Sequence, residues 1–286
     1  MSRYRFPGVA ALLLSLAAIA CAPAANSATR EGRTASGLAW DVRGSGPPVV
    51  LIHGAMLDRR QWDPQAPLAD RFTVIRYDTR WHGISAGADA PFRATDDLAA
   101  VLDTVGVDQV SVIGLSHGAQ IAVDFALAHP ERVAALVLVS PGLGGYQPME
   151  RPDFWAPMME MLSAGNHDSA AALLARSPVM VVNAENAAWV EAMVRDQATV
   201  FGQNPAFEQQ PDPPAIRRLG EIRVPTLVIT GGADLRDIAL TGDTLEQGIP
   251  GARRVVIPHA THLLTISHAA EFNRLVTDFL PGGDDR

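Results

Sequence analysis

Ser116 is the residue whose neighbours best suit it for covalent chemistry. It lies in the segment Gly114-Leu115-Ser116-His117-Gly118, which matches the pattern Gly-x-Ser-x-Gly. In this pattern a serine occupies a sharp turn between a strand and a helix, and the two glycines let those elements pack closely. The turn presents the hydroxyl to solvent, where a base and an orienting carboxylate can make it a nucleophile. The segment therefore predicts nucleophilic catalysis.

The sequence around Ser116 also predicts the strand and the helix that such a turn requires. Val110 to Ile113 is a short β-branched run typical of a buried strand, and from Ala119 apolar residues recur at helical spacing. Similar apolar runs predict strands over 38–42, 49–52, 72–77, 133–139, 224–230 and 254–257. Helices are predicted between them, including a threonine-capped helix from Thr95 to Leu102 and a last helix over 269–279. This alternation indicates an α/β fold with a mostly parallel sheet flanked by helices.

From about Gly37 to Leu280 the sequence resembles the α/β-hydrolase superfamily. The resemblance is densest at the serine turn, at His53-Gly54-Ala55-Met56, and at Trp62-Asp63-Pro64-Gln65 with Arg76-Tyr77-Asp78-Thr79-Arg80. The last two segments are similar to those of the branch that contains 3-oxoadipate enol-lactonases and small esterases. It implies the α/β-hydrolase fold with an inserted helical lid.

The resemblance implies a catalytic triad in the chain order serine, acid, histidine. Three histidines follow the last predicted strand: His259, His262 and His268. The family places its histidine a few residues beyond that strand and just before Leu263-Leu264, which favours His262 as the base. His259 is the alternative.

The acid of the triad is expected near the edge of the sheet where Ser116 emerges. Asp234 follows the predicted strand over 224–230 and is our candidate. Asp237 and Asp243 lie further along the chain and are more simply interpreted as solvated charges. We therefore expect Ser116, Asp234 and His262 to form the triad.

The resemblance further implies an oxyanion hole made of two backbone N–H groups. One belongs to His117, and the other to Ala55, the residue after His53-Gly54. Met56 is expected to face the substrate pocket, and His53 to hold its loop in place. The related branch usually has glycine where this chain has Trp81, so we expect Trp81 to line the substrate pocket and to change the loop path beside it.

The strand and helix alternation stops at Pro141-Gly142-Leu143-Gly144-Gly145. Helices are predicted over 154–162, 169–176 and 187–200, and residues 179–182 form the one strand-like run. We assign residues 143–220 to the helical lid and residues 29–142 and 221–286 to the core. Most large apolar side chains of the lid are expected to pack it on the core, and a few to line an apolar acyl pocket. These side chains are Trp155, Met158, Met159, Met161, Met180, Trp189, Met193 and Phe201.

Residues 1–28 resemble an export signal. A start with two arginines is followed by an almost wholly apolar run over 9–20 and by a border of small residues. Cys21, the one cysteine of the chain, follows Ala18-Ile19-Ala20 as in a bacterial lipoprotein box, and an ordinary signal peptide cleaved a few residues later is the alternative. We expect an exported protein that is periplasmic, secreted or lipid-anchored in the bacterial cell envelope.

Composition narrows the partners and cofactors. The 286 residues are 48 % hydrophobic and carry a formal net charge of −8, without basic runs, so we expect no nucleic-acid partner. The mature body has no other apolar run long enough for an integral membrane span and no second cysteine for a disulfide. The histidines do not follow a metal-ligand pattern, and no glycine-rich phosphate loop opens a helix. We expect neither a metal nor another cofactor.

These features together predict a serine hydrolase that cleaves small carboxylic esters or lactones through an acyl-enzyme on Ser116. Two other activities use the same triad, carbon–carbon bond hydrolysis and peroxyacid formation. A different class of function is also open, a binding protein that has the fold without catalysis.

Overall fold

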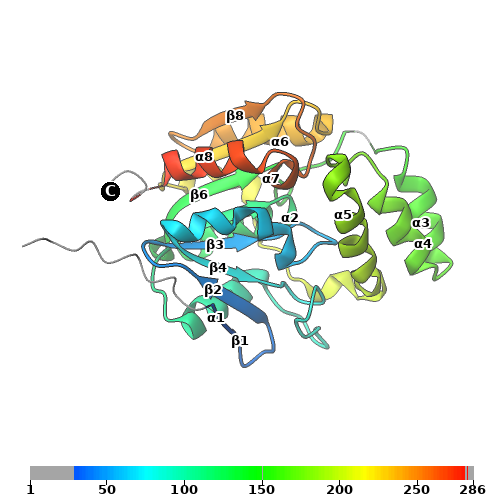
Figure 1. The fold of residues 1–286 in the computed structure, drawn as a ribbon, viewed down its shortest axis with the longest axis horizontal. Coiled ribbons are helices and arrows are strands. Elements are labelled where there is room, and N and C mark those ends of the chain that lie inside the picture. The colour runs from blue at the N-terminus through cyan, green and yellow to red at the C-terminus, as the bar shows by residue number, and fades with distance from the viewer. Residues whose placement is uncertain (1–28, 150, 281, 283–286) are drawn as a thin grey trace, which may run out of the picture.

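The computed structural model describes residues 29–149, 151–280 and 282. One eight-stranded sheet, with the strand order β1-β2-β4-β3-β5-β6-β7-β8, forms the centre (Figure 1). The two pairs that involve β2 are antiparallel and all other pairs are parallel, which confirms the predicted α/β-hydrolase fold with a mostly parallel sheet. The strands are β1 Arg30–Arg33, β2 Ala39–Arg43, β3 Pro48–Ile52, β4 Thr73–Tyr77, β5 Val110–Leu115, β6 Val133–Val139, β7 Thr226–Gly231 and β8 Arg253–Ile257.

Helices fill the connections between strands. The α-helices are α1 Ala94–Val105, α2 His117–Ala128, α3 Trp155–Ser163, α4 His167–Ala175, α5 Ala184–Asp196, α6 Arg236–Gly248, α7 Leu264–Ser267 and α8 Ala269–Phe279. The 3-10 helices are η1 Arg59–Asp70, η2 Pro130–Arg132, η3 Ala198–Gly202, η4 Pro205–Phe207, η5 Ala215–Arg217 and η6 Leu219–Glu221.

Helices cover both faces of the sheet because successive strand residues point to opposite sides. In β3, Val49 and Leu51 belong to the same buried cluster as Trp62 of η1 and Phe272 of α8. Val50 and Ile52 belong to the cluster on the other face, against α1, α2 and α6. Nearly continuous apolar strands are what a parallel sheet buried on both faces requires.

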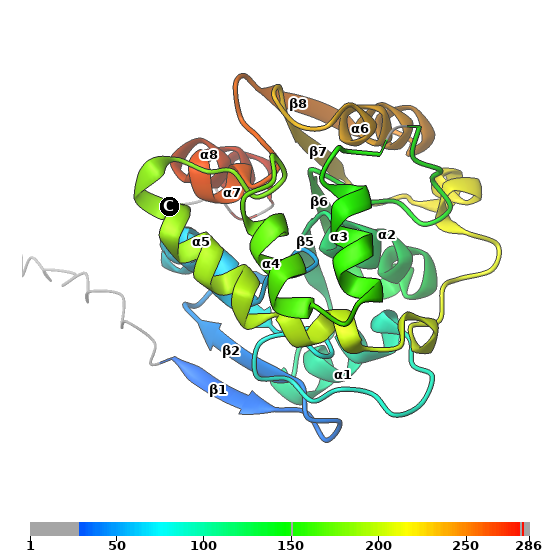
Figure 2. The same cartoon turned by 90° about the vertical axis from the view of Figure 1, so that its right-hand side faces the viewer.

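The insertion between β6 and β7 contains α3, α4 and α5. Both views of the molecule place these helices beyond the carboxyl ends of the parallel strands (Figures 1 and 2). Each begins or ends within a few residues of its predicted bounds, but residues 179–182 form no strand. Val179 and Met180 line the cavity below the insertion, Val182 packs against the buried cluster, and Val181 is exposed.

Gln197, at the end of α5, fastens the insertion to two loops of the core. Its amide nitrogen donates a hydrogen bond to Asp58 Oδ2 at 2.9 Å, and its amide oxygen accepts one from the Gly83 N–H at 2.8 Å. The residue is only 2 % exposed. At the other end of the insertion, the Tyr146 hydroxyl donates to Asp237 Oδ1 at 3.0 Å.

Two local expectations were wrong. The helix α1 begins at Ala94, one residue before Thr95, and its N-cap residue Arg93 makes no capping hydrogen bond through its side chain. The Arg80 guanidinium instead pairs with Asp97 in the first turn, at 2.7 Å. The strand β1 was not predicted, because its sequence, Arg-Glu-Gly-Arg, lacks an apolar face and it lies at the edge of the sheet.

The expectations for residues 1–28, including an acylated Cys21, lie outside the described residues. Within the part of the chain that the structure describes, no helix has both the length and the apolar character needed to cross a membrane.

Candidate active site

Ser116 connects β5 to α2 with a strained backbone. Its φ is 54° and its ψ is −113°, a conformation that costs free energy for a residue with a side chain. The glycines on either side explain how the turn fits. A Cβ on Gly114 would collide with the carbonyl oxygen of Gly118, and one on Gly118 would collide with the carbonyl oxygen of Ile52. Both glycines of the pentapeptide are therefore required for the close approach of strand, helix and the neighbouring strand β3.

Asp234 and His262 lie on the loops that follow β7 and β8. His262 Nδ1 lies 3.1 Å from both carboxylate oxygens of Asp234, and the two side chains are 6 % and 2 % exposed. Asp234 Oδ1 also accepts the Leu235 N–H at 2.7 Å. The two loops are joined by a hydrogen bond from the Ala233 N–H to the Ala260 carbonyl. An imidazole that donates from Nδ1 to a buried carboxylate keeps the lone pair on Nε2, where it can accept a proton.

The other candidates for the base and the acid are exposed or bonded to other partners. His259 is exposed and has a φ of 60°, and His268 lies at the start of α8 against the Ser267 hydroxyl at 2.9 Å. Asp243 forms an ion pair with Arg254 at 2.8 Å, and Asp237 accepts the hydrogen bond from Tyr146.

Ser116 and His262 line one cavity of about 660 Å³ between the sheet and the insertion. Ala55 and Met56 line it as well. Its wall is mostly apolar, and among the described lining residues Arg151 is the one permanent cation. Five of the eight large side chains that the sequence singled out contribute to it: Trp155, Met158, Met159, Met180 and Phe201. The other three pack within the insertion and against the core: Met161, Trp189 and Met193.

Hydrogen bonds hold the loop that contains Ala55 in one shape. The Gly54 N–H donates to Gln61 Oε1 at 2.9 Å, and the Met56 N–H donates to His82 Nε2 at 3.3 Å. Met56 itself has a φ of 59°. Among the described residues, the Ala55 N–H donates no hydrogen bond. That N–H is therefore available to a ligand in the cavity.

Two buried histidines stabilise this loop in their neutral form. His53 accepts the Thr79 N–H on Nε2 at 3.0 Å, so its Nδ1 carries the proton and donates to the Gly54 carbonyl at 2.8 Å. Burial lowers the pKa of His53 to about 4. Burial, together with the nearby His53, lowers the pKa of His82 to about 3. Each ring can accept its backbone N–H only while that nitrogen is unprotonated.

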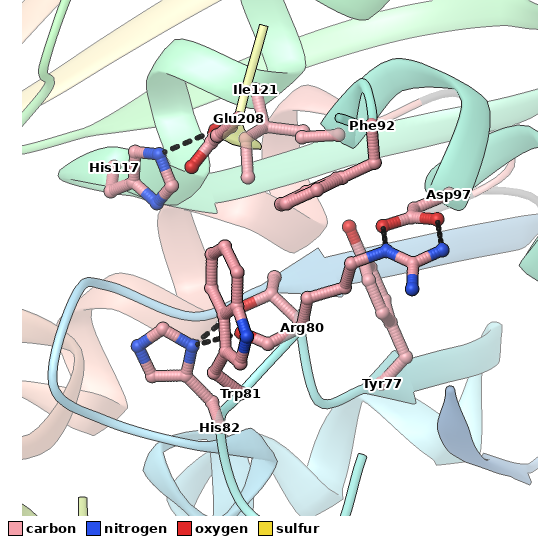
Figure 3. Close-up of a pocket in the computed structure, with 11 residues that line it drawn as sticks. Tyr77, Arg80, Trp81, His82, Phe92, Asp97, His117, Ile121 and Glu208 are labelled. Atoms are coloured by element: carbon pink, nitrogen blue, oxygen red, sulfur yellow. Dashed lines mark hydrogen bonds and ion pairs between the residues drawn. The ribbon is translucent and has the colours of Figure 1, made fainter. Parts of the chain in front are cut away.

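The structure corrects the expected place of Trp81. Trp81 lines a second cavity of about 30 Å³ that does not include Ser116 (Figure 3). It adopts a φ of 67° in a turn where its N–H donates to the Ala86 carbonyl, and its ring packs edge-on against Phe92, with centroids 5.1 Å apart. Trp81 therefore does not line the cavity that contains Ser116.

His117 and Glu208 meet at this second cavity. His117 Nε2 lies 3.1 Å from Glu208 Oε1 (Figure 3). The sequence analysis did not identify Glu208, which lies 91 residues away in a polar segment without a recognisable motif. Among the described residues, no group of three or more His, Cys, Asp or Glu side chains is arranged to hold a metal ion.

Comparison with known proteins identifies the family of this chain. Residues 49–275 match the model of the alpha/beta hydrolase family. A 2-hydroxy-6-oxononadienedioate/2-hydroxy-6-oxononatrienedioate hydrolase from Cupriavidus pinatubonensis is 31 % identical over 255 residues, which are 81 % of this chain and 86 % of the relative. A pimeloyl-[acyl-carrier protein] methyl ester esterase from Neisseria meningitidis serogroup B is 28 % identical over 245 residues, covering 82 % of this chain and 93 % of the relative.

A solved structure is similar over most of its length. The enol-lactonase from Burkholderia xenovorans aligns with a TM-score of 0.70 and 26 % sequence identity, covering 87 % of this chain and 99 % of that chain. The family model covers the strand that precedes the candidate oxyanion loop, the serine turn and the loops that carry Asp234 and His262. The chain belongs to the alpha/beta hydrolase family.

Proposed function

We propose that this protein is a serine hydrolase that cleaves carboxylic esters or lactones through an acyl-enzyme on Ser116. One observation carries the proposal. The strained serine opens into the same apolar cavity as a histidine whose other ring nitrogen is bonded to a buried carboxylate. A serine hydroxyl is a weak nucleophile at neutral pH, and this arrangement supplies the base that it needs.

In the proposed first half-reaction, His262 Nε2 takes the proton of the Ser116 hydroxyl as Oγ attacks the carbonyl carbon of the ester. Asp234 stays ionised, holds the imidazole tautomer and stabilises the imidazolium. The carbonyl oxygen becomes an oxyanion that accepts hydrogen bonds from the His117 and Ala55 N–H groups. Each such donor is worth about 3 kcal/mol in comparable sites.

Collapse of this intermediate breaks the bond to the alcohol oxygen, which leaves with the proton from His262. The acyl group remains on Ser116. In the second half-reaction His262 takes a proton from water as the water attacks the acyl-enzyme. The acid is then released and Ser116 regains its proton.

His117 can donate in this way because it is the first residue of α2. The first N–H groups of a helix have no acceptor within the helix, and they lie at the positive end of its dipole. The His117 N–H therefore has no acceptor within α2 and can bind negative charge that develops beside Ser116.

The cavity supports an apolar acyl group as the preferred substrate. Methionine, leucine and aromatic side chains from α3, α4 and the loop after α4 line the part of its wall that the insertion forms. We propose that residues 143–220 act as a lid over this group. We also propose that residues 1–28 direct export of the protein, as their composition supports.

The 31 % identical relative favours a second candidate reaction. It is named as a hydrolase of 2-hydroxy-6-oxononadienedioate, a dicarboxylate. Hydrolysis of a carbon–carbon bond in such a substrate would use the same triad. A dianionic substrate needs cationic partners, and Arg151 is the single permanent cation among the described lining residues. Esters with an apolar acyl group fit this lining better.

The test is hydrolysis of p-nitrophenyl esters, from acetate to octanoate, by the mature protein beside Ser116→Ala and His262→Ala. We expect activity in the wild type and its loss in both variants. A wild type that is inert towards these esters and is not labelled by a serine-directed phosphonate would contradict the proposal. Turnover of the dienedioate in preference to every ester would favour the second candidate.

A further inference from the structure

The imidazole of His117 faces away from the chemistry that its backbone serves. The His117 N–H is a proposed oxyanion donor, but its side chain lines the 30 Å³ cavity behind the serine turn (Figure 3). A void next to a side chain means that packing alone does not fix it. The restraint visible in the structure is polar, a 3.1 Å contact between His117 Nε2 and Glu208 Oε1.

His117 and Glu208 each favour the charged form of the other. Burial alone would lower the pKa of His117, but the hydrogen bond and charge of Glu208 raise it above its ordinary value. Burial would raise the pKa of Glu208, and the contact with His117 lowers it. Asp124, seven residues further along α2, also favours the charged imidazole. Both directions describe an ion pair, which is stronger than a neutral hydrogen bond.

Glu208 is itself held by the core. It follows η4 in residues 203–225, which lead from η3 to β7 and are called the return segment below. Phe92, in the loop before α1, donates its N–H to the Phe207 carbonyl and accepts the Gln209 N–H, both at 2.8 Å. Residues 92 and 208 therefore form an isolated parallel bridge.

A second contact joins the same two elements. Gln120 Nε2 donates to Gln210 Oε1 at 2.7 Å. His117 and Gln120 are three residues apart on α2, so they share one face of its first turn. The return segment thus braces the start of α2 at two points.

We propose that Glu208 is a positioning residue for the oxyanion hole. Through the His117 side chain it fixes the first turn of α2 and hence the direction of the His117 N–H. This inference rests on the proposed function. The turn needs such a brace because Ser116 holds a strained φ, and a strained segment relaxes unless its surroundings oppose the change.

The test compares Glu208→Ala and Glu208→Gln with the wild type on one p-nitrophenyl ester. We expect kcat of the alanine variant to fall about tenfold, less than the 10²–10³-fold that complete loss of an oxyanion donor costs. KM should stay within about twofold, because ground-state contacts in the apolar cavity are unchanged. The glutamine variant should retain part of kcat, since its amide oxygen still accepts a hydrogen bond from His117.

Affinity for a trifluoromethyl ketone gives a readout that a general loss of stability would not move. Addition of the Ser116 oxygen to this ketone produces a tetrahedral oxyanion, which the hole must hold. The inhibition constant should rise by the same factor as kcat falls. The variant His117→Ala combined with Glu208→Ala should be no slower than the slower single variant, because both remove one interaction.

Glu221→Gln is the matched control. Glu221 pairs with Arg218 at 2.7 Å on the surface of the same return segment, away from the serine turn. We expect it to leave kcat unchanged. Thermal unfolding of each variant verifies that the assayed protein is folded, and the glutamine variant provides the comparison if the alanine variant does not fold.

The outcomes separate the two proposals. Turnover that survives Ser116→Ala contradicts the proposed function and the positioning role with it. A wild type that depends on Ser116, beside a Glu208→Ala variant with unchanged kcat and unchanged inhibitor affinity, contradicts the positioning role alone. A KM that rises as much as kcat falls also contradicts it.

Discussion

Two cavities are lined by successive residues of the serine turn, and they differ in size and in the charged side chains that border them. The one that Ser116 lines has about 660 Å³ and a wall of methionine, leucine and aromatic side chains. The one that the next residue, His117, lines has about 30 Å³, and beside aromatic side chains it is bordered by the ion-paired Arg80, Asp97 and Glu208. Adaptable apolar side chains suit the recognition of a substrate, whereas fixed ion pairs suit the positioning of reacting groups. If the proposed function holds, we expect substitutions in the large cavity to change selectivity and substitutions at the His117 pair to change rate.

The largest expected effect is on the acid that supports the base. Asp234→Asn should lower kcat by about 10³–10⁴-fold with little change in KM, because the amide no longer favours the productive imidazole tautomer. The measurement is steady-state hydrolysis of a p-nitrophenyl ester. Asp237→Asn is the matched control, since Asp237 lines the same cavity but is bonded to Tyr146. An equally deep loss in that variant would move the role of the acid to Asp237.

A smaller effect is expected on the apolar side. Met158→Trp should reduce kcat/KM for the octanoate ester about 10–100-fold while acetate is nearly unaffected, because the larger ring fills space that a long acyl chain occupies. Met149→Trp, at a residue that is 68 % exposed and outside the described cavity wall, serves as control. Equal losses for acetate and octanoate would break the proposed division between rate and selectivity.

The smallest expected effect is on the free energy of unfolding and its dependence on pH. His53 and His82 have pKa values of about 4 and about 3 in the folded protein, against 6.5 for an ordinary histidine. Between pH 6.5 and pH 4 the unfolded chain binds more protons than the folded one, so these residues make the folded protein less stable as the pH falls. Above pH 6.5 they have no such effect.

His82→Gln tests this pH dependence, because a glutamine oxygen can still accept the Met56 N–H without titrating. The loss of unfolding free energy between pH 6.5 and pH 4.5 should be smaller than in the wild type by about 1–2 kcal/mol. Urea unfolding at several pH values measures it. His259→Gln, at an exposed histidine, should leave the wild-type slope in place. Parallel curves for wild type and His82→Gln would show that His82 is not held neutral.

Local patterns in the sequence were enough to predict the sheet and the serine turn. The need for Gly114 and Gly118 follows from contacts between neighbours in the chain and one adjacent strand. The two segments that suggested the enol-lactonase branch also prove to be in contact, because Arg76 pairs with Asp63 at 2.7 Å.

Contacts between distant side chains were beyond such patterns. Glu208 has no periodicity or motif that points to His117, and only the fold brings the two together. Trp81 was placed wrongly because the direction of its side chain depends on a left-handed backbone that a sequence pattern does not reveal. The domain bounds stay predictions, and the variants of Ser116, His262 and Asp234 test the proposed triad.

Hydrogen bonds attach both ends of the insertion to the core. Tyr146 bonds to Asp237 before α3, and Gln197 bonds to Asp58 after α5. Between these ends, the Thr261 hydroxyl donates to the Val181 carbonyl at 2.7 Å, and apolar side chains of the insertion belong to the same buried cluster as core residues. Glu208 follows Gln197 in the chain and lies outside α3 to α5. We therefore expect a hybrid chain that receives α3 to α5 from another member of the family to change its substrate range and to keep the proposed residues Ser116, Asp234 and His262, because all three lie outside the exchanged segment.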